Sequence, residues 1–154
     1  MPSLNPRIVE ALYGEALTLA ETLRARFERL RTETRPPAAG LDDDLLRVQA
    51  SCEALRTTTR VMHCLAWLLN HRAHFAGELS ELQLRRHGRL IANFPANDAA
   101  AVATLPEDVR DLIHESERLY ARILRLERAW RGEPQAGASA IDRLRERIAA
   151  RQAH

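Results

Sequence analysis

Lysine is absent from this chain of 154 residues, so all 23 basic side chains are arginines. They are opposed by 21 acidic side chains, which leaves a formal net charge of only +2. Domains that bind nucleic acid usually concentrate uncompensated positive charge on one face, whereas here acidic and basic residues are mixed along the chain. The charge balance therefore argues against nucleic acid as the main partner.

Cysteines and long apolar runs are also scarce. Cys52 and Cys64 fall in one helical pattern, about 18 Å apart along its axis, which is too far for a disulfide. The densest apolar stretch, residues 61–69, is far shorter than the roughly 20 residues that span a bilayer. The first residues lack a basic segment followed by an apolar run, the pattern of a secretory signal. We therefore expect a cytoplasmic protein with reduced thiols and no membrane contact.

The chain is rich in helical periodicity. Apolar residues make up 45% of it, which is enough to bury the core of one domain. The first helical segment is capped by Asn5, starts at Pro6 and ends before Pro36. Its apolar residues recur at steps of three and four, as on one side of a helix. They are Ile8, Leu12, Ala16, Leu19, Leu23, Phe27 and Leu30.

The second helical segment opens at residues 42–44, where three aspartates suit the positive end of a helix dipole, and closes near Gly77. We expect one apolar stripe of this helix to face the bundle. The stripe consists of Val48, Cys52, Leu55, Thr59, Met62, Ala66, Leu69 and Ala73. Ser80 then caps a short helix that we expect from Glu81 to about Ala92.

A third long helix is predicted from Thr104 and Pro106 to Gly132. Its apolar side carries Leu112, Ser116, Leu119, Tyr120, Ile123 and Trp130. These segments predict an all-α fold, an antiparallel bundle of three long helices with one or two short accessory helices. We assign residues 1–131 to the bundle domain and residues 132–154 to a linker and a short C-terminal helix. Ile141, Leu144 and Ile148 would make that last helix a partner-binding tail.

The second helix is apolar on its other side as well, through Val61, Cys64, Leu65 and Leu68. A helix that is apolar around most of its circumference needs an additional partner. We therefore predict a homodimer whose interface contains these four residues. The alternative is that residues 81–92 fold back and cover this side within one chain.

Residues 56–72 of the second helix resemble the signature of the RcdA family, the regulators of CtrA degradation. A looser second patch consists of Leu105, Pro106, Ser116 and residues 119–120, 122–123 and 125–127, and the resemblance covers roughly residues 8–130. The signature residues are Thr58, Thr59, Arg60, Met62, Ala66, Trp67, Leu68, Leu69 and Arg72.

The resemblance implies a function that spacing alone does not show. RcdA proteins are helical bundles, usually dimeric, and act as adaptors that help the ClpXP protease receive regulatory substrates in cell-cycle control. It therefore implies ClpX and regulatory client proteins as partners. The chain after Trp130 matches the family poorly, which leaves the choice of partner open.

Catalytic and metal-binding patterns are weak. His63, Cys64, His71 and His74 lie close in sequence, but only His71 and His74 share a helix side closely enough to meet one ion. Phosphate-binding loops and nucleophile elbows are absent, and the spacing of Asp111 and His114 is common by chance. We therefore expect no enzyme activity, no catalytic residues, no metal and no cofactor.

Two arginine groups leave a DNA-associated regulator as the alternative function. One group is Arg85, Arg86, His87 and Arg89, and the other is Arg118, Arg122 and Arg125. The first lacks interleaved aromatic residues for base stacking, and the second shares its helix side with acidic residues. Arg60 and Glu127 lie beside apolar stripes. Two arrangements are open for them: they form an ion pair with each other across helices, or both extend to the surface along their aliphatic stems.

Overall fold

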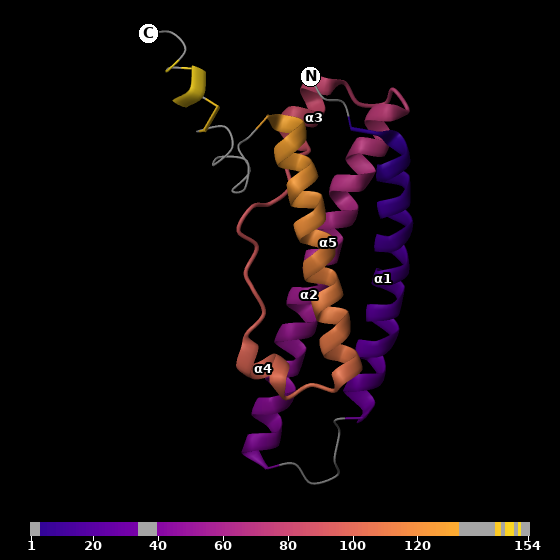
Figure 1. Ribbon diagram of the computed structural model, residues 1–154. Coiled ribbons are helices and arrows are strands. Elements are labelled where there is room, and N and C mark those ends of the chain that lie inside the picture. The colour runs from indigo at the N-terminus through magenta and orange to yellow at the C-terminus, as the bar shows by residue number, and fades with distance from the viewer. Residues whose placement is uncertain (1–3, 34–39, 133–143, 146, 150, 152–154) are drawn as a thin grey trace.

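The computed structural model describes residues 4–33, 40–132, 144–145, 147–149 and 151. Its helices are α1 (Pro6–Glu33), α2 (Leu41–Phe75), α3 (Glu81–His87), α4 (Ala99–Ala103) and α5 (Glu107–Arg131). The three long helices α1, α2 and α5 pack side by side along their length (Figure 1). No strand occurs in the described ranges. The predicted all-α bundle is therefore confirmed.

The connection between α2 and α5 determines the direction of the third long helix. After α2 ends, the chain passes through α3, returns along the whole bundle and reaches α4 beside the start of α5 (Figure 1). As a result α1 runs antiparallel to both α2 and α5, and these two run in the same direction.

α1 presents one apolar side to the core. Asn5 caps the helix because its Oδ1 accepts a hydrogen bond from the backbone N–H of Arg7 at 2.9 Å. Ile8, which we expected in the stripe, is 45% exposed, and Val9 is buried in its place. The buried apolar residues are Val9, Leu12, Ala16, Leu19, Leu23, Phe27 and Leu30.

An ion pair fastens the end of α1 to the start of α5. Arg26 Nε lies 2.5 Å from Asp108 Oδ2, and the same guanidinium contacts Glu33 at 3.2 Å. The hydrogen bond from Arg26 lowers the pKa of Asp108 and raises the pKa of Arg26. The pair thus holds together the ends of two helices that are distant in sequence.

The short helices have local causes. Ser80 and Gln83 form a reciprocal capping box at the start of α3, as Ser80 predicts. α3 ends at His87, earlier than expected, and Gly88 is its C-cap residue, where an added Cβ atom would lie only 2.7 Å from the Leu84 carbonyl oxygen. α4 was not predicted, and Asp98 caps it by accepting from the Ala100 N–H at 2.9 Å.

The orientation predicted for the second helix is wrong. Val61, Cys64, Leu65 and Leu68, which we assigned to a dimer interface, are at most 7% exposed and lie in the core of one chain. We name their side the inner α2 face, and it also contains Glu53, Thr57, Arg60, Trp67 and His71. The stripe that we expected to face the bundle is instead turned outward.

The physical reason for this error is the polar content of the inner α2 face. Glu53, Thr57, Arg60 and His71 are all at most 2% exposed, although each carries polar atoms. A reading of hydrophobic periodicity therefore selects the opposite, more uniformly apolar side of α2 as the buried one. The alternative that residues 81–92 cover this side is correct in part, because Leu84 and Leu90 are buried, but α1 and α5 also pack against α2.

Two of the long helices end just before glycines that the sequence predicts as their ends. Gly77 and Gly132 have φ angles of +79° and +72°, which L side chains rarely adopt, and they follow the ends of α2 and α5. Of the predicted tail residues, Leu144 and Ile148 lie in helical backbone and are 56% and 51% exposed. Ile141 lies outside the described residues. In the described part of the chain, no helix has the length and apolar character needed to cross a membrane.

Candidate protein-binding face

The outward side of α2 is apolar along nearly the whole helix. We name it the outer α2 face and define it by residues that alternate at steps of four and three. They are Leu41, Leu45, Val48, Cys52, Leu55, Thr59, Met62, Ala66, Leu69 and Ala73. Leu55 is 69% exposed, Val48 59% and Met62 55%, so these side chains are open to solvent in the single chain.

This alternation is a heptad repeat, the pattern by which helices pack against other helices. It continues over more than four heptads, beyond the three to four that indicate a coiled coil. Monomeric proteins rarely expose apolar surface as extended as this, and such patches usually mark sites of protein contact. The outer α2 face is therefore the candidate functional site of this chain.

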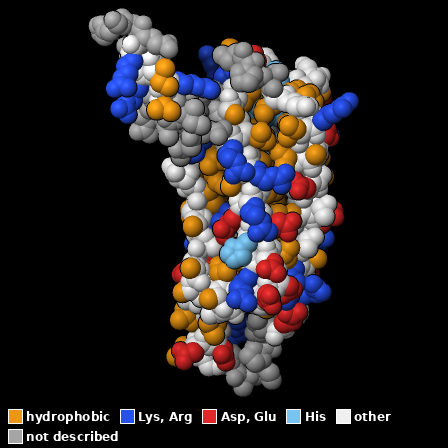
Figure 2. All heavy atoms as spheres, viewed as in Figure 1, with side chains coloured by type: hydrophobic (Ala, Val, Ile, Leu, Met, Phe, Trp, Pro, Cys, Tyr) orange, Lys and Arg blue, Asp and Glu red, His pale blue; other side chains and the backbone are white. Residues whose placement is uncertain are grey.

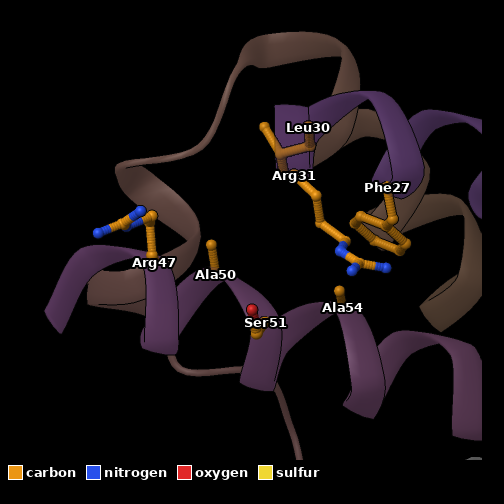
Figure 3. Close-up of a pocket in the computed structure, with 7 residues that line it drawn as sticks. All are labelled: Phe27, Leu30, Arg31, Arg47, Ala50, Ser51 and Ala54. Atoms are coloured by element: carbon orange, nitrogen blue, oxygen red, sulfur yellow. The ribbon is translucent and has the colours of Figure 1, made fainter. Parts of the chain in front are cut away.

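A cleft of about 500 Å³ adjoins this face, between the last turns of α1 and the first turns of α2. Figure 3 shows its lining, in which apolar side chains accompany two arginines and one serine. The residues are Phe27, Leu30, Arg31, Arg47, Ala50, Ser51 and Ala54. Arg47 and Ser51 also line a shallow hollow with Val48, Cys52 and Leu55, which joins the cleft to the outer α2 face.

The family-signature residues divide between the two sides of α2. Arg60, Trp67 and Leu68 are buried on the inner α2 face. Thr59, Met62, Ala66 and Leu69 belong to the outer α2 face, and Thr58 beside them is exposed. Arg72 pairs with Glu10 of α1 at 2.7 Å, a hydrogen bond that raises its pKa, and stacks 4.1 Å above the Tyr13 ring.

Arg60 forms the centre of a buried polar network. Its guanidinium donates to Ser116 Oγ of α5 at 3.0 Å, to Asn97 Oδ1 at 2.7 Å and to the Pro95 carbonyl at 3.3 Å. Burial lowers the pKa of Arg60. The network joins α2 and α5 to the chain segment that precedes α4.

Glu53 supplies the acceptor side of this network, and sequence reasoning did not identify it. Its Oε2 accepts from Asn97 Nδ2 at 2.6 Å and from the Asp98 N–H at 3.3 Å, while Arg56 contacts Oε1 at 2.9 Å. The signal was available, because Glu53 is seven residues before Arg60 and therefore lies on the same helix side.

Glu127 fastens the other end of the returning connection. Its Oε2 accepts from the Leu90 N–H at 2.5 Å, and its Oε1 pairs with Arg131. Tyr120 Oη donates to the Ile91 carbonyl in the same segment. Glu127 and Arg60 are each 2% exposed, so neither extends to the surface, and their partners are different groups rather than each other.

The histidines and cysteines of the second helix are dispersed. Cys64 is buried, which raises its pKa to about 12, and His63 contacts the Phe94 ring. His71 packs against Trp67, and burial lowers its pKa to about 4, whereas His74 Nδ1 contacts the Leu79 carbonyl. Within the described residues, no group of three or more His, Cys, Asp or Glu side chains is placed to hold a metal ion.

The two arginine groups are mixed with acidic and aromatic partners. Arg85 pairs with Glu81 at 3.1 Å and lies over the Trp130 ring, and Arg122 pairs with Glu15 of α1 at 3.2 Å. Figure 2 shows acidic and basic side chains interspersed over the exposed side of α5. Asp111 is exposed and His114 lies 4.0 Å from Glu117, so this pair faces solvent rather than a cavity.

The bundle and its outer α2 face define the class of protein, a small helical-bundle protein with an extended exposed apolar surface. The chain belongs to the family described as protein of unknown function DUF1465, which it matches over residues 1–152. No curated protein and no solved structure matches the chain.

Proposed function

We propose that this protein is a non-catalytic adaptor that works by binding other proteins. The observation that carries the proposal is the outer α2 face, an exposed heptad of apolar side chains on an otherwise well-packed bundle. The resemblance of residues 56–72 to the RcdA family gives the finer form of the proposal. In that form the adaptor presents regulatory substrates to ClpXP and takes part in cell-cycle control.

The proposal is tested with purified protein immobilised on resin. Wild-type protein should retain purified ClpX and, from the native lysate, client proteins whose degradation by ClpXP it accelerates. Leu55→Glu places a charge in the middle of the outer α2 face and should reduce capture at least about tenfold, the effect of losing roughly 1.4 kcal/mol. Leu17→Glu is the matched control, because Leu17 is 40% exposed on α1.

Two results would contradict the adaptor. The first is equal capture by wild type and Leu55→Glu, which would remove the outer α2 face from the function. The second is retention of DNA with a steep salt dependence and no ClpX or client, which would favour the DNA-associated regulator.

The non-catalytic part of the proposal has its own test. Purified protein should contain no stoichiometric metal, because the histidines of α2 contact separate groups. Elemental analysis that finds about one zinc or iron per chain, lost in His71→Ala, would contradict it.

A further inference from the structure

The cleft beside the outer α2 face combines an apolar lining with positive charge, and we propose that it anchors an acidic amphipathic helix of a partner protein. One aromatic side chain of that helix fills the cleft, and a carboxylate one turn away pairs with Arg31. This inference rests on the proposed function, in which the protein works by binding other proteins, and it names the chemical class of the partner.

The size and the lining of the cleft suit a large side chain. Its volume is about 500 Å³, and sites that enclose small ligands measure roughly 300–1,000 Å³. Phe27 and Leu30 of α1 and Ala50 and Ala54 of α2 supply its apolar walls. The residues that contribute most to protein interfaces are often aromatic and fill pockets of this kind. The cleft is therefore suited to an aromatic anchor.

Arg31 places a positive charge at the cleft. In the described part of the chain, its guanidinium has no ion-pair or hydrogen-bond partner, whereas Arg47 on the other wall pairs with Asp44. Figure 3 shows the Arg31 side chain extending across the cleft toward Ala54, while Arg47 points away from it. A guanidinium can donate two parallel hydrogen bonds to one carboxylate. A carboxylate is therefore the group that Arg31 is placed to bind.

The charges of α2 favour an acidic partner over a basic one. The only acidic residue within residues 45–73 is Glu53, which is buried. Arg47, Arg56 and Arg72 keep about a third of their side chains exposed. Each also has an acidic neighbour within the chain, so these arginines bias the surface towards acidic partners, and Arg31 supplies the specific contact.

The surface next to the cleft favours a helix. The shallow hollow formed by Arg47, Val48, Ser51, Cys52 and Leu55 continues the cleft onto the outer α2 face. A helix that lies along this hollow presents apolar side chains at steps of three, four and seven residues, with acidic ones beside them. The cleft then holds the first anchor, and the outer α2 face holds the next ones.

Two synthetic peptides test the charge of the partner. Both are fluorescently labelled amphipathic helices with the same apolar side and one tryptophan. One has glutamates beside the apolar side, and the other has lysines at the same positions. In fluorescence anisotropy, wild type should bind the glutamate peptide at least about tenfold more tightly than the lysine peptide, and added salt should reduce that ratio. Equal affinities would show adhesion to apolar surface alone and overturn the proposal.

Three variants test the place of binding. Arg31→Glu should weaken binding of the glutamate peptide about tenfold and strengthen binding of the lysine peptide. Arg29→Glu is the matched control, because Arg29 is exposed on the same helix and does not line the cleft, and it should bind as wild type does. Ser51→Trp narrows the cleft without changing charge and should also weaken binding. Circular dichroism checks that each variant is folded. Unchanged binding of the glutamate peptide by Arg31→Glu would overturn the proposal.

Two results separate this inference from the proposed function. Capture of ClpX and clients that is lost in Leu55→Glu but complete in Arg31→Glu would support the adaptor and overturn the acidic helix in the cleft. The expected peptide preference without any capture of ClpX or clients would do the reverse. Binding to anionic phosphatidylglycerol vesicles that depends on Arg31, without a peptide preference, would assign this charge to a lipid surface and overturn the inference.

Discussion

In an ordinary surface helix the buried side is apolar and the exposed side is polar, whereas α2 buries several polar side chains and exposes a row of apolar ones. The inner α2 face buries Glu53, Thr57, Arg60 and His71, whereas the outer α2 face exposes large apolar side chains. α5 follows the usual pattern more closely, because its buried side is apolar apart from Ser116 and Glu127 and its exposed side is rich in charged residues. The comparison teaches that apolar content alone does not decide which side of a helix enters the core.

The side of α2 that enters the core is decided by which side finds packing and hydrogen-bond partners in the rest of the bundle. Three polar residues of the inner α2 face find hydrogen-bond partners within the bundle, and burial of such groups is inexpensive once they are bonded. The outer α2 face finds no comparable cover in the described part of the chain, as its exposure shows. The following predictions test this difference, beginning with the largest effect.

Neighbouring leucines provide the most direct test. Leu68 is fully buried and Leu69 is 46% exposed. Leu68→Ala should lower the free energy of unfolding by about 2–5 kcal/mol, because it leaves a cavity in the core. Leu69→Ala should change it by less than about 0.5 kcal/mol. Urea denaturation at a low protein concentration, where the single chain is measured, distinguishes them. Equal losses would mean that the two sides of α2 do not differ.

The buried network should have the next largest effect. Arg60→Met removes the donor to Ser116, Asn97 and the Pro95 carbonyl, and should destabilise the fold by about 3 kcal/mol. Arg24→Met is the control, since Arg24 is exposed and pairs only loosely with Glu28 at 4.0 Å. A loss for Arg60→Met as small as that of the control would mean that the network does not hold the returning connection.

The sequence predicts more of the fold than of the candidate site. Periodicity, caps and glycines predicted the three long helices and α3, because these signals are local. The face that α2 turns inward depends on Asn97 and Ser116, which are distant in sequence and supply partners for Glu53 and Arg60. No local pattern reports such partners. The heptad of the outer α2 face was visible in the sequence, but its exposure required the packed structure.

His71 should make the inner α2 face sensitive to pH. Burial, with His74 and Arg131 nearby, lowers its pKa from 6.5 to about 4, so the unfolded chain binds a proton more readily than the folded one. The stability contributed by neutral His71 is therefore complete above about pH 6.5 and is lost as the pH falls towards about 4. Between about pH 7.5 and about pH 5 the loss should be about 2 kcal/mol.

Chemical denaturation at these pH values measures the effect. His71→Phe retains an aromatic ring against Trp67 and Trp130 and should show little change over the same interval. The pKa of Asp108 is lowered from an already acidic value, so its contribution falls at a lower pH. An equal decline in the wild type and in His71→Phe would assign the pH dependence to other groups.

The two cysteines give the last and least disruptive test, because they report on the two sides of α2 without a substitution. Cys52 belongs to the outer α2 face and Cys64 to the inner one, where burial raises its pKa to about 12 and suppresses the reactive thiolate. Iodoacetamide should therefore modify Cys52 in the native protein and reach Cys64 only after unfolding, as mass spectrometry of peptides shows. Labelling of Cys64 as fast as that of Cys52 would place both thiols in the same environment and remove the distinction between the two faces.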